Sequence, residues 1–111
     1  MKTVIFALVV ISLVAFAPAA HATNFTCNPI NVASFANRVH VQCGPGAGVL
    51  VFFAVSTANP ATAQRFVEIS TAALVNNKSL LIQFDPANAT GPSFGCAINN
   101  CRPAASIFIN K

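Results

Sequence analysis

The chain has 111 residues, of which 55% are hydrophobic and only 7% are charged, and its formal net charge is +4. This length suits one small domain, and its few cations are spread along the chain rather than gathered in a stripe. Because proteins that hold nucleic acid through its phosphates normally carry clustered Lys and Arg, the composition argues against a nucleic-acid partner.

The N-terminal segment has the features of a cleaved export signal. Lys2 gives a positive start, Val4–Phe16 is an almost unbroken apolar run, and Ala20-His21-Ala22 supplies the small residues that signal peptidases accept. A membrane anchor is the alternative, but the run is shorter than the roughly 20 residues that a spanning helix needs. We therefore expect residues 1–22 to be removed, and residues 23–111 to form one secreted or periplasmic domain without a membrane span.

Three strands are predicted in the first half of this domain. Ile30–Ser34 turns near residues 35–37 and pairs as a hairpin with a strand from Arg38 to Cys43. Along the second strand Val39, Val41 and Cys43 lie on one side, and Arg38, His40 and Gln42 lie on the other. Glycines then break the chain, and Val49–Ser56 is a continuous apolar run typical of a central strand buried on both sides.

A helix is predicted from Pro60 to about Asn76, because the apolar residues recur there at steps of three and four. Asn59 caps its first turn, and Asn76-Asn77 is typical of a helix end. The predicted apolar face consists of Ala63, Phe66, Val67, Ser70, Ala73 and Leu74.

The chain after the helix is predicted to form two strands joined by a long loop. Ser79–Phe84 returns to strand character, residues 86–103 are rich in loop-forming residues, and Ala104–Ile109 is the last strand. A disulfide between Cys96 and Cys101 would restrain this loop, since Asn99-Asn100 between them tolerates left-handed backbone angles.

The cysteines predict two disulfides, because an even number in a short exported chain indicates a stapled domain. The mature part contains Cys27, Cys43, Cys96 and Cys101. If the chain folds back at the first hairpin turn, near residues 35–37, Cys27 lies opposite Cys43, close enough for a disulfide. This leaves Cys96 to pair with Cys101. Oxidised cysteines hold no zinc, so we expect no metal site.

The order of three strands, one helix and two strands predicts a mainly β fold with one helix, of the α+β class. It is the layout of a small five-stranded Greek-key barrel of the oligonucleotide/oligosaccharide-binding (OB) type. The alternative is an open sheet with one helix packed on it. We favour the barrel because closure removes edge strands that invite aggregation in so apolar a chain.

Two short stretches also carry a family resemblance. "FFAVST" (Phe52–Thr57) precedes the helix, and "FGC" (Phe94–Cys96) precedes a second cysteine, Cys101. In this order the motifs resemble the receptor-binding B subunits of the subtilase-cytotoxin and typhoid-toxin type, and still more closely the small exported bacterial proteins related to them. The resemblance covers roughly Val39 to Ile109.

The resemblance implies an OB-type barrel, a ring of five subunits and the binding of cell-surface glycans. Those toxin subunits bind sialylated sugars through a serine and nearby acidic and aromatic residues early in their chains. This chain has no matching pattern, and it contains neither Tyr nor Trp.

No catalytic group is expected, and no cofactor. Glu68 and Asp85 are the only carboxylate side chains, and neither position suggests the mutual geometry that acid/base catalysis requires. Glu68 lies on the polar face of the helix near Arg65, while Asp85 precedes Pro86 in a turn. His40, the one histidine of the mature part, is expected to be a surface or interface residue.

The sequence thus predicts an exported, non-enzymatic binding protein. Its apolar surface favours a homo-oligomer, because so small a domain cannot bury all its apolar side chains. The expected ligand is a glycan, and the polar candidates for its site are Arg38, His40, Asn99, Asn100 and Arg102. The alternative is a structural or inhibitory protein, periplasmic or secreted, that binds another protein through its apolar surface.

Overall fold

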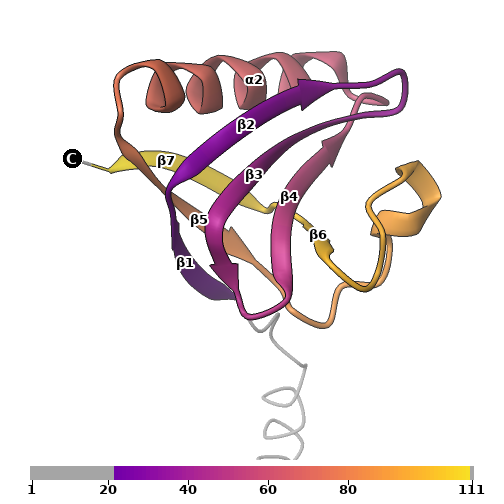
Figure 1. Ribbon diagram of the computed structural model, residues 1–111. Helices are drawn as coiled ribbons and strands as arrows, with labels where there is room; N and C mark the ends of the chain where they lie inside the picture. Colours follow the sequence, from indigo (N-terminus) through magenta and orange to yellow (C-terminus); the bar gives the residue numbers. More distant parts are fainter. Residues whose placement is uncertain (1–21, 111) are drawn as a thin grey trace, which may run out of the picture.

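Two β-sheets and one long helix make up the part of the chain that the computed structural model describes, residues 22–110 (Figure 1). All but the last residue of the segment interpreted as an export signal lies outside this range. The elements in chain order are β1 (Thr23–Cys27), β2 (Pro29–Ser34), β3 (Arg38–Ala47), β4 (Leu50–Ser56), α2 (Pro60–Val75), β5 (Ser79–Phe84), the short 3-10 helix η1 (Gly91–Phe94), β6 (Cys101–Pro103) and β7 (Ser106–Asn110).

The strands form a three-stranded sheet in the order β1-β5-β7 and a four-stranded sheet in the order β2-β3-β4-β6. Neighbouring strands are antiparallel except β4 and β6, which are parallel. The predicted class, mainly β with one helix, is confirmed. The described residues form seven strands in two sheets, however, rather than five strands closed into one barrel.

The additional strands arise where the chain passes from one sheet to the other. Between β1 and β2 lies only Asn28, and Pro29, which has no N–H to donate, begins the second of these strands. Between β6 and β7, the Ala104 N–H donates to the Ala54 carbonyl at 2.9 Å, and the Ala105 N–H donates to the Gln83 carbonyl at 2.8 Å. Consecutive residues therefore bond to different sheets. The predicted strands Ile30–Ser34 and Ala104–Ile109 correspond to β2 and β7, and the sequence did not predict β1 and β6.

The alternation predicted for β3 is confirmed, because Val39, Val41 and Cys43 are all buried. The prediction that this strand ends at Cys43 is wrong, since it continues to Ala47 with a register shift after Gln42. Gly46 permits the continuation. A Cβ atom at this position would lie 2.5 Å from the Leu50 carbonyl oxygen, so the backbones approach too closely for any side chain.

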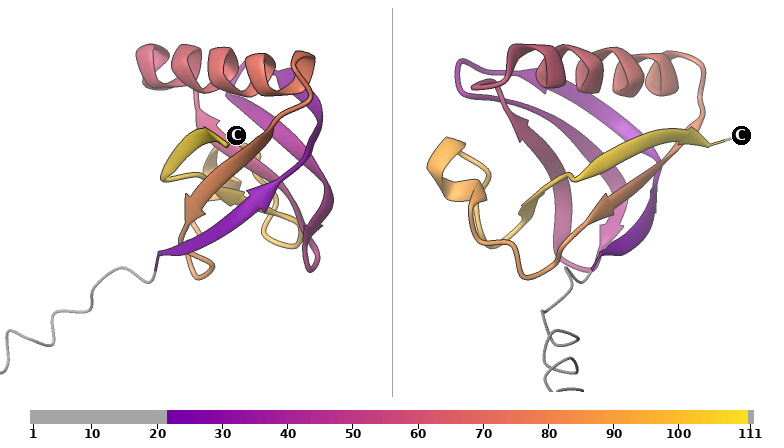
Figure 2. Two further views of the ribbon diagram at one scale, coloured as in Figure 1. Left: turned by 90° about the vertical axis from the view of Figure 1, so that its left-hand side faces the viewer. Right: turned by 180° about the vertical axis from the view of Figure 1, so that it is seen from behind.

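The helix α2 begins as predicted, with the Asn59 Oδ1 accepting the Thr62 N–H at 3.2 Å. It ends at Val75, and Asn77 takes the left-handed conformation at φ 55. Figures 1 and 2 show α2 lying across one end of both sheets. It turns toward them the buried residues Ala63, Phe66, Ser70 and Ala73, all of which were predicted for its apolar face. No helix in residues 22–110 has the length and apolar character needed to cross a membrane.

Phe53 joins the two sheets at the centre of the core. Its ring lies 5.7 Å from that of Phe25 on β1 and 4.8 Å from that of Phe84 on β5, measured between centroids. Val41, Leu80 and other apolar side chains without exposed surface surround it. Aromatic pairs at this spacing add to the free energy gained by burial alone, so this contact helps hold the sheets together.

Both predicted disulfides are confirmed. Cys27 of β1 is bonded to Cys43 of β3, which links the two sheets close to the bend at Asn28. Cys96 is bonded to Cys101, which closes the loop between η1 and β6. The Asn99-Asn100 pair within this loop does not adopt the left-handed angles that were expected, whereas Gly95, directly before the loop, has a positive φ.

Replacing Phe53 with alanine is expected to lower the free energy of unfolding by about 3–5 kcal/mol, because it leaves a cavity where the sheets meet. Urea unfolding of the oxidised mature protein measures this change. Phe108→Ala is the control, since Phe108 is 50% exposed and its loss should cost far less. Equal losses for the two variants would contradict the central role of Phe53.

Candidate functional site

The candidate site lies on the outer face of the four-stranded sheet, opposite the core. On β3 the side chains of Arg38 and His40 alternate with those of buried Val39 and Val41, so they point away from the core. On β4, Ala54 pairs with His40 and Ser56 with Arg38, and Phe52 lies on the same outer face because its neighbour Phe53 enters the core.

The disulfide loop covers part of this outer face. Ala54, Cys96 and Cys101 form a second buried apolar cluster, against which Phe52 and Phe94 pack. Beside this cluster opens a pocket of about 200 Å³. It is lined by Arg38, His40, Phe52, Gly95, Ala97, Asn100 and Cys101. Below, we call it the β3–loop pocket.

His40 is held between two aromatic rings. Its ring centroid lies 5.1 Å from that of Phe35 and 4.7 Å from that of Phe52, and only 9% of its surface is exposed. Of the two expected positions for His40, the surface position is therefore wrong, and the interface position stays a prediction. Burial lowers the pKa of His40 below its ordinary value of 6.5, and the nearby positive charge of Arg38 lowers it further. At neutral pH the imidazole is uncharged and offers one donor and one acceptor.

Arg38 supplies the charge of the pocket. Its Cζ lies 4.0 Å from the centroid of the Phe35 ring, in cation–π geometry. A weak hydrogen bond of 3.5 Å joins its Nη1 to the Asn37 Oδ1. Within residues 22–110 neither carboxylate side chain forms an ion pair with Arg38, so most of its five N–H donors are available to a ligand.

Gly95 allows the loop to approach this guanidinium. A Cβ atom at Gly95 would lie 2.5 Å from the Arg38 Nη1, and the φ of +92 is one that side chains disfavour. The glycine follows η1, where its N–H donates to the Pro92 carbonyl at 3.2 Å. A residue larger than glycine would therefore force the Arg38 guanidinium to shift.

Backbone hydrogen bonds fix the remaining walls. The Asn100 carbonyl accepts the N–H groups of both Val51 and Phe52 at 3.1 Å, which ties the end of the loop to β4. Thr57 holds the turn that carries Phe35, because its hydroxyl donates to the Ala36 carbonyl at 2.8 Å. The aromatic and loop residues are thus positioned before any ligand arrives.

The predicted site residues divide into two groups. Arg38, His40 and Asn100 line the same pocket, whereas Asn99 is exposed outside it. Arg102 also lies outside. Its guanidinium donates to the carbonyls of Pro86 at 2.7 Å, Ile98 at 2.6 Å and Cys101 at 2.8 Å, so it is engaged in fixing the loop.

Sequence reasoning missed the aromatic part of the site, Phe35 and Phe52. The adjacent Phe52 and Phe53 could have indicated it, because neighbours on a strand point to opposite faces and only one of them can enter the core. Phe35 left no such signal, since it lies in a turn.

The described part of the chain, residues 22–110, contains no group of three or more His, Cys, Asp or Glu side chains placed to hold a metal ion. Comparison of the chain with family models, with curated proteins and with solved structures finds no match.

Lowering the pH should destabilise the protein through His40. Since its pKa is lowered in the folded state, the unfolded chain binds the proton more readily. The free energy of unfolding should therefore fall as the pH drops below 6.5, and this contribution should level off below the folded pKa. NMR titration of His40 and urea unfolding at several pH values measure both quantities.

Two variants separate the two causes of the lowered His40 pKa, burial and the charge of Arg38. His40→Gln should abolish this part of the pH dependence, while Arg38→Gln should raise the pKa of His40 only in part, since burial is the larger cause. A His40 pKa at or above 6.5 in the wild-type protein would contradict the assignment.

Proposed function

We propose that this protein is an exported, non-enzymatic binding protein that recognises cell-surface glycans at the β3–loop pocket. The observation that carries the proposal is the convergence of Arg38, His40 and Asn100 beside the ring of Phe52. Sugars have apolar C–H faces and polar hydroxyl edges. An aromatic surface with a few fixed donors and acceptors suits both parts.

The proposed architecture is a modified OB barrel. If β1 and β2 are counted as one bent strand, and β6 and β7 as another, five strands remain with α2 between the third and the fourth. In this proposal the two bent strands contribute to both sheets, and each of the five strands then has a neighbour on both sides. This cyclic order is the basis on which we propose an OB-type architecture.

The place of the pocket agrees with this architecture. OB folds bind oligosaccharides on the face of their second and third strands, between the loops that join strands one to two and four to five. In this protein those strands are β3 and β4. The two loops are the turn of Phe35 and the segment that contains Gly95 and Asn100, and these lie around the same pocket.

Self-association completes the proposed function. Exposed apolar side chains occur on β2, β7, the end of α2 and several loops, as Ile30, Phe35, Val49, Val75, Ile98, Phe108 and Ile109. Further copies of the chain would cover part of this surface, and a ring of five follows from the toxin resemblance. Light scattering of the oxidised mature protein is expected to give a multiple of the monomer mass, and a monomer at every concentration would contradict this part of the proposal.

Screening the mature protein on a glycan array, followed by titration of the best ligand, tests the binding function. Arg38→Gln should weaken binding about tenfold or more, because hydrogen bonds to charged groups contribute roughly 1.5–3 kcal/mol. Arg65→Gln is the matched control, since Arg65 lies on α2 and does not line this pocket. Absence of any bound glycan, or equal loss in the two variants, would exclude this site.

A pair of glycine variants tests the geometry of the pocket. Gly95→Ala should weaken glycan binding, because the added Cβ forces the Arg38 guanidinium to shift. Gly48→Ala is the control, since Gly48 also has a positive φ but nothing lies within 4 Å of an added Cβ. Both variants place a side chain at a positive φ, and the contacts of the added Cβ with Arg38 and Asn37 separate Gly95 from Gly48. Equal binding by the two variants would contradict this role of Gly95.

A protein partner is the second candidate. Phe35, which is 44% exposed, and Ile98, which is 49% exposed, lie on the turn and the loop that flank the site, and such residues favour contact with another protein. Recovery of one stoichiometric partner whose binding is lost in Phe35→Ser and Ile98→Ser would support it. Retained binding in both variants would exclude this surface.

A further inference from the structure

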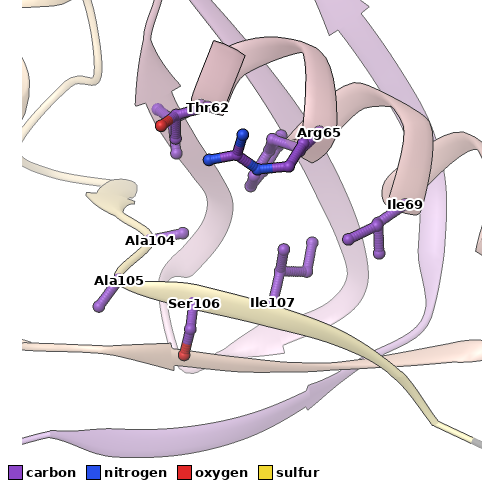
Figure 3. A pocket seen from close by; sticks show the side chains of 9 residues that line it. Thr62, Arg65, Ile69, Ala104, Ala105, Ser106 and Ile107 are labelled. Carbon is purple, nitrogen blue, oxygen red and sulfur yellow. The ribbon is translucent and has the colours of Figure 1, made fainter. Parts of the chain in front are cut away.

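A second pocket lies between α2 and the segment that joins β6 to β7 (Figure 3). Its volume is about 230 Å³. It is lined by Val55, Thr62, Arg65, Phe66, Ile69, Ala104, Ala105, Ser106 and Ile107. None of these residues lines the β3–loop pocket, so the two are separate.

The pocket exists because small residues stand where the chain changes sheets. Ala104 and Ala105 donate their N–H groups to different sheets, and their methyl groups do not fill the space beneath the helix. Phe66 and Ile69 of α2 and Ile107 of β7 form its apolar walls. These apolar walls would contact the hydrocarbon part of a ligand.

Arg65 gives the pocket its only charge. Figure 3 shows its side chain extending from α2 over the pocket, with Thr62 on the same side. Arg65 forms no hydrogen bond or ion pair with another residue in the range 22–110. An anionic group at the mouth of the pocket would therefore meet an available guanidinium.

The neighbouring carboxylate does not neutralise this charge. Glu68 lies three residues after Arg65, a spacing that permits an ion pair on a helix. Its Oε2 instead accepts the Gln64 Nε2 at 3.1 Å, and both residues line a different hollow on the other flank of α2. The two flanks of the helix thus carry opposite charge.

The size of the pocket restricts the ligand. At roughly 30 Å³ for each water-sized group, 230 Å³ holds on the order of eight such groups. This is less than the pockets of about 300–1,000 Å³ that enclose drug-sized molecules.

We propose that this pocket binds a small organic monocarboxylate with an aromatic or branched aliphatic body. The body lies between Phe66, Ile69 and Ile107, and the carboxylate accepts hydrogen bonds from the Arg65 guanidinium. The site is independent of the glycan site, because it uses neither its residues nor its loop.

Titration of the methyl-labelled mature protein with benzoate and with isovalerate, followed by NMR, tests the proposal. The methyl signals of Ile69 and Ile107 should shift and saturate with either acid. Benzyl alcohol, which has the same ring without the charge, should bind at least tenfold more weakly. If neither benzoate nor isovalerate, at tens of millimolar, produces saturable shifts of the Ile69 and Ile107 methyl signals, the proposal is overturned.

Variants test separately what the charge of Arg65 and the volume of the pocket contribute to binding. Arg65→Gln should weaken benzoate binding about tenfold and leave the binding of benzyl alcohol unchanged. Ala104→Val narrows the pocket and should weaken both ligands, whereas Arg38→Gln should affect neither. Equal affinities for benzoate and benzyl alcohol would overturn the proposal and indicate a site that does not depend on charge. Magnetisation transfer from a second copy of the chain to the Ile69 and Ile107 methyl groups would also overturn it and indicate a subunit interface.

Discussion

Phe52 and Phe53 are neighbours on β4, and the pleat of the strand sends their side chains to opposite faces of the sheet. Phe53 meets Phe25 and Phe84 in the core, while Phe52 stacks on His40 outside it. Both arrangements depend on the register that places Phe53 opposite Val41. A slip of one residue would exchange the faces of the two rings and empty the core and the pocket together. The core and the candidate site therefore share one constraint.

The candidate site owes its shape to a loop as much as to the sheet. The disulfide between Cys96 and Cys101 restrains the loop, and the Arg102 guanidinium donates hydrogen bonds to three backbone carbonyl groups that precede it in the chain. The Asn100 carbonyl then anchors the loop on β4. Binding residues carried on loops need such support from a rigid scaffold. Arg102 is thus important to the site without lining it.

Local patterns were the most predictable part of this fold. Ser79–Phe84 forms a strand with the predicted bounds, and Asn59 caps the helix, because hydrophobic period and capping chemistry act between near neighbours. The strands β1 and β6 were missed. Thr23–Cys27 is stabilised by pairing with β5, and Cys101–Pro103 by pairing with β4, so both depend on partners far away in the sequence.

In the candidate site too, features set by near neighbours in the sequence could be predicted, and features set by distant segments could not. Alternation along β3 places Arg38 and His40 on one face, which the sequence alone could indicate. It could not show that Phe35, Phe52 and the disulfide loop cover this face, so the sequence did not predict the burial of His40 within its own chain. Asn99 and Arg102 were chosen for their polarity within the loop. Which of its side chains turn toward the sheet depends on backbone hydrogen bonds that composition does not reveal.

The parallel pairing of β4 with β6 has a consequence for the order in which the molecule is assembled. Parallel strands cannot be joined by a tight turn, and α2, β5 and the disulfide loop all lie between these two along the chain. Contacts between segments so distant in sequence form slowly, because the intervening chain must first lose entropy. We therefore expect Asn100 and β6 to join the sheet late, so that the candidate site is incomplete until the C-terminal part of the chain can fold.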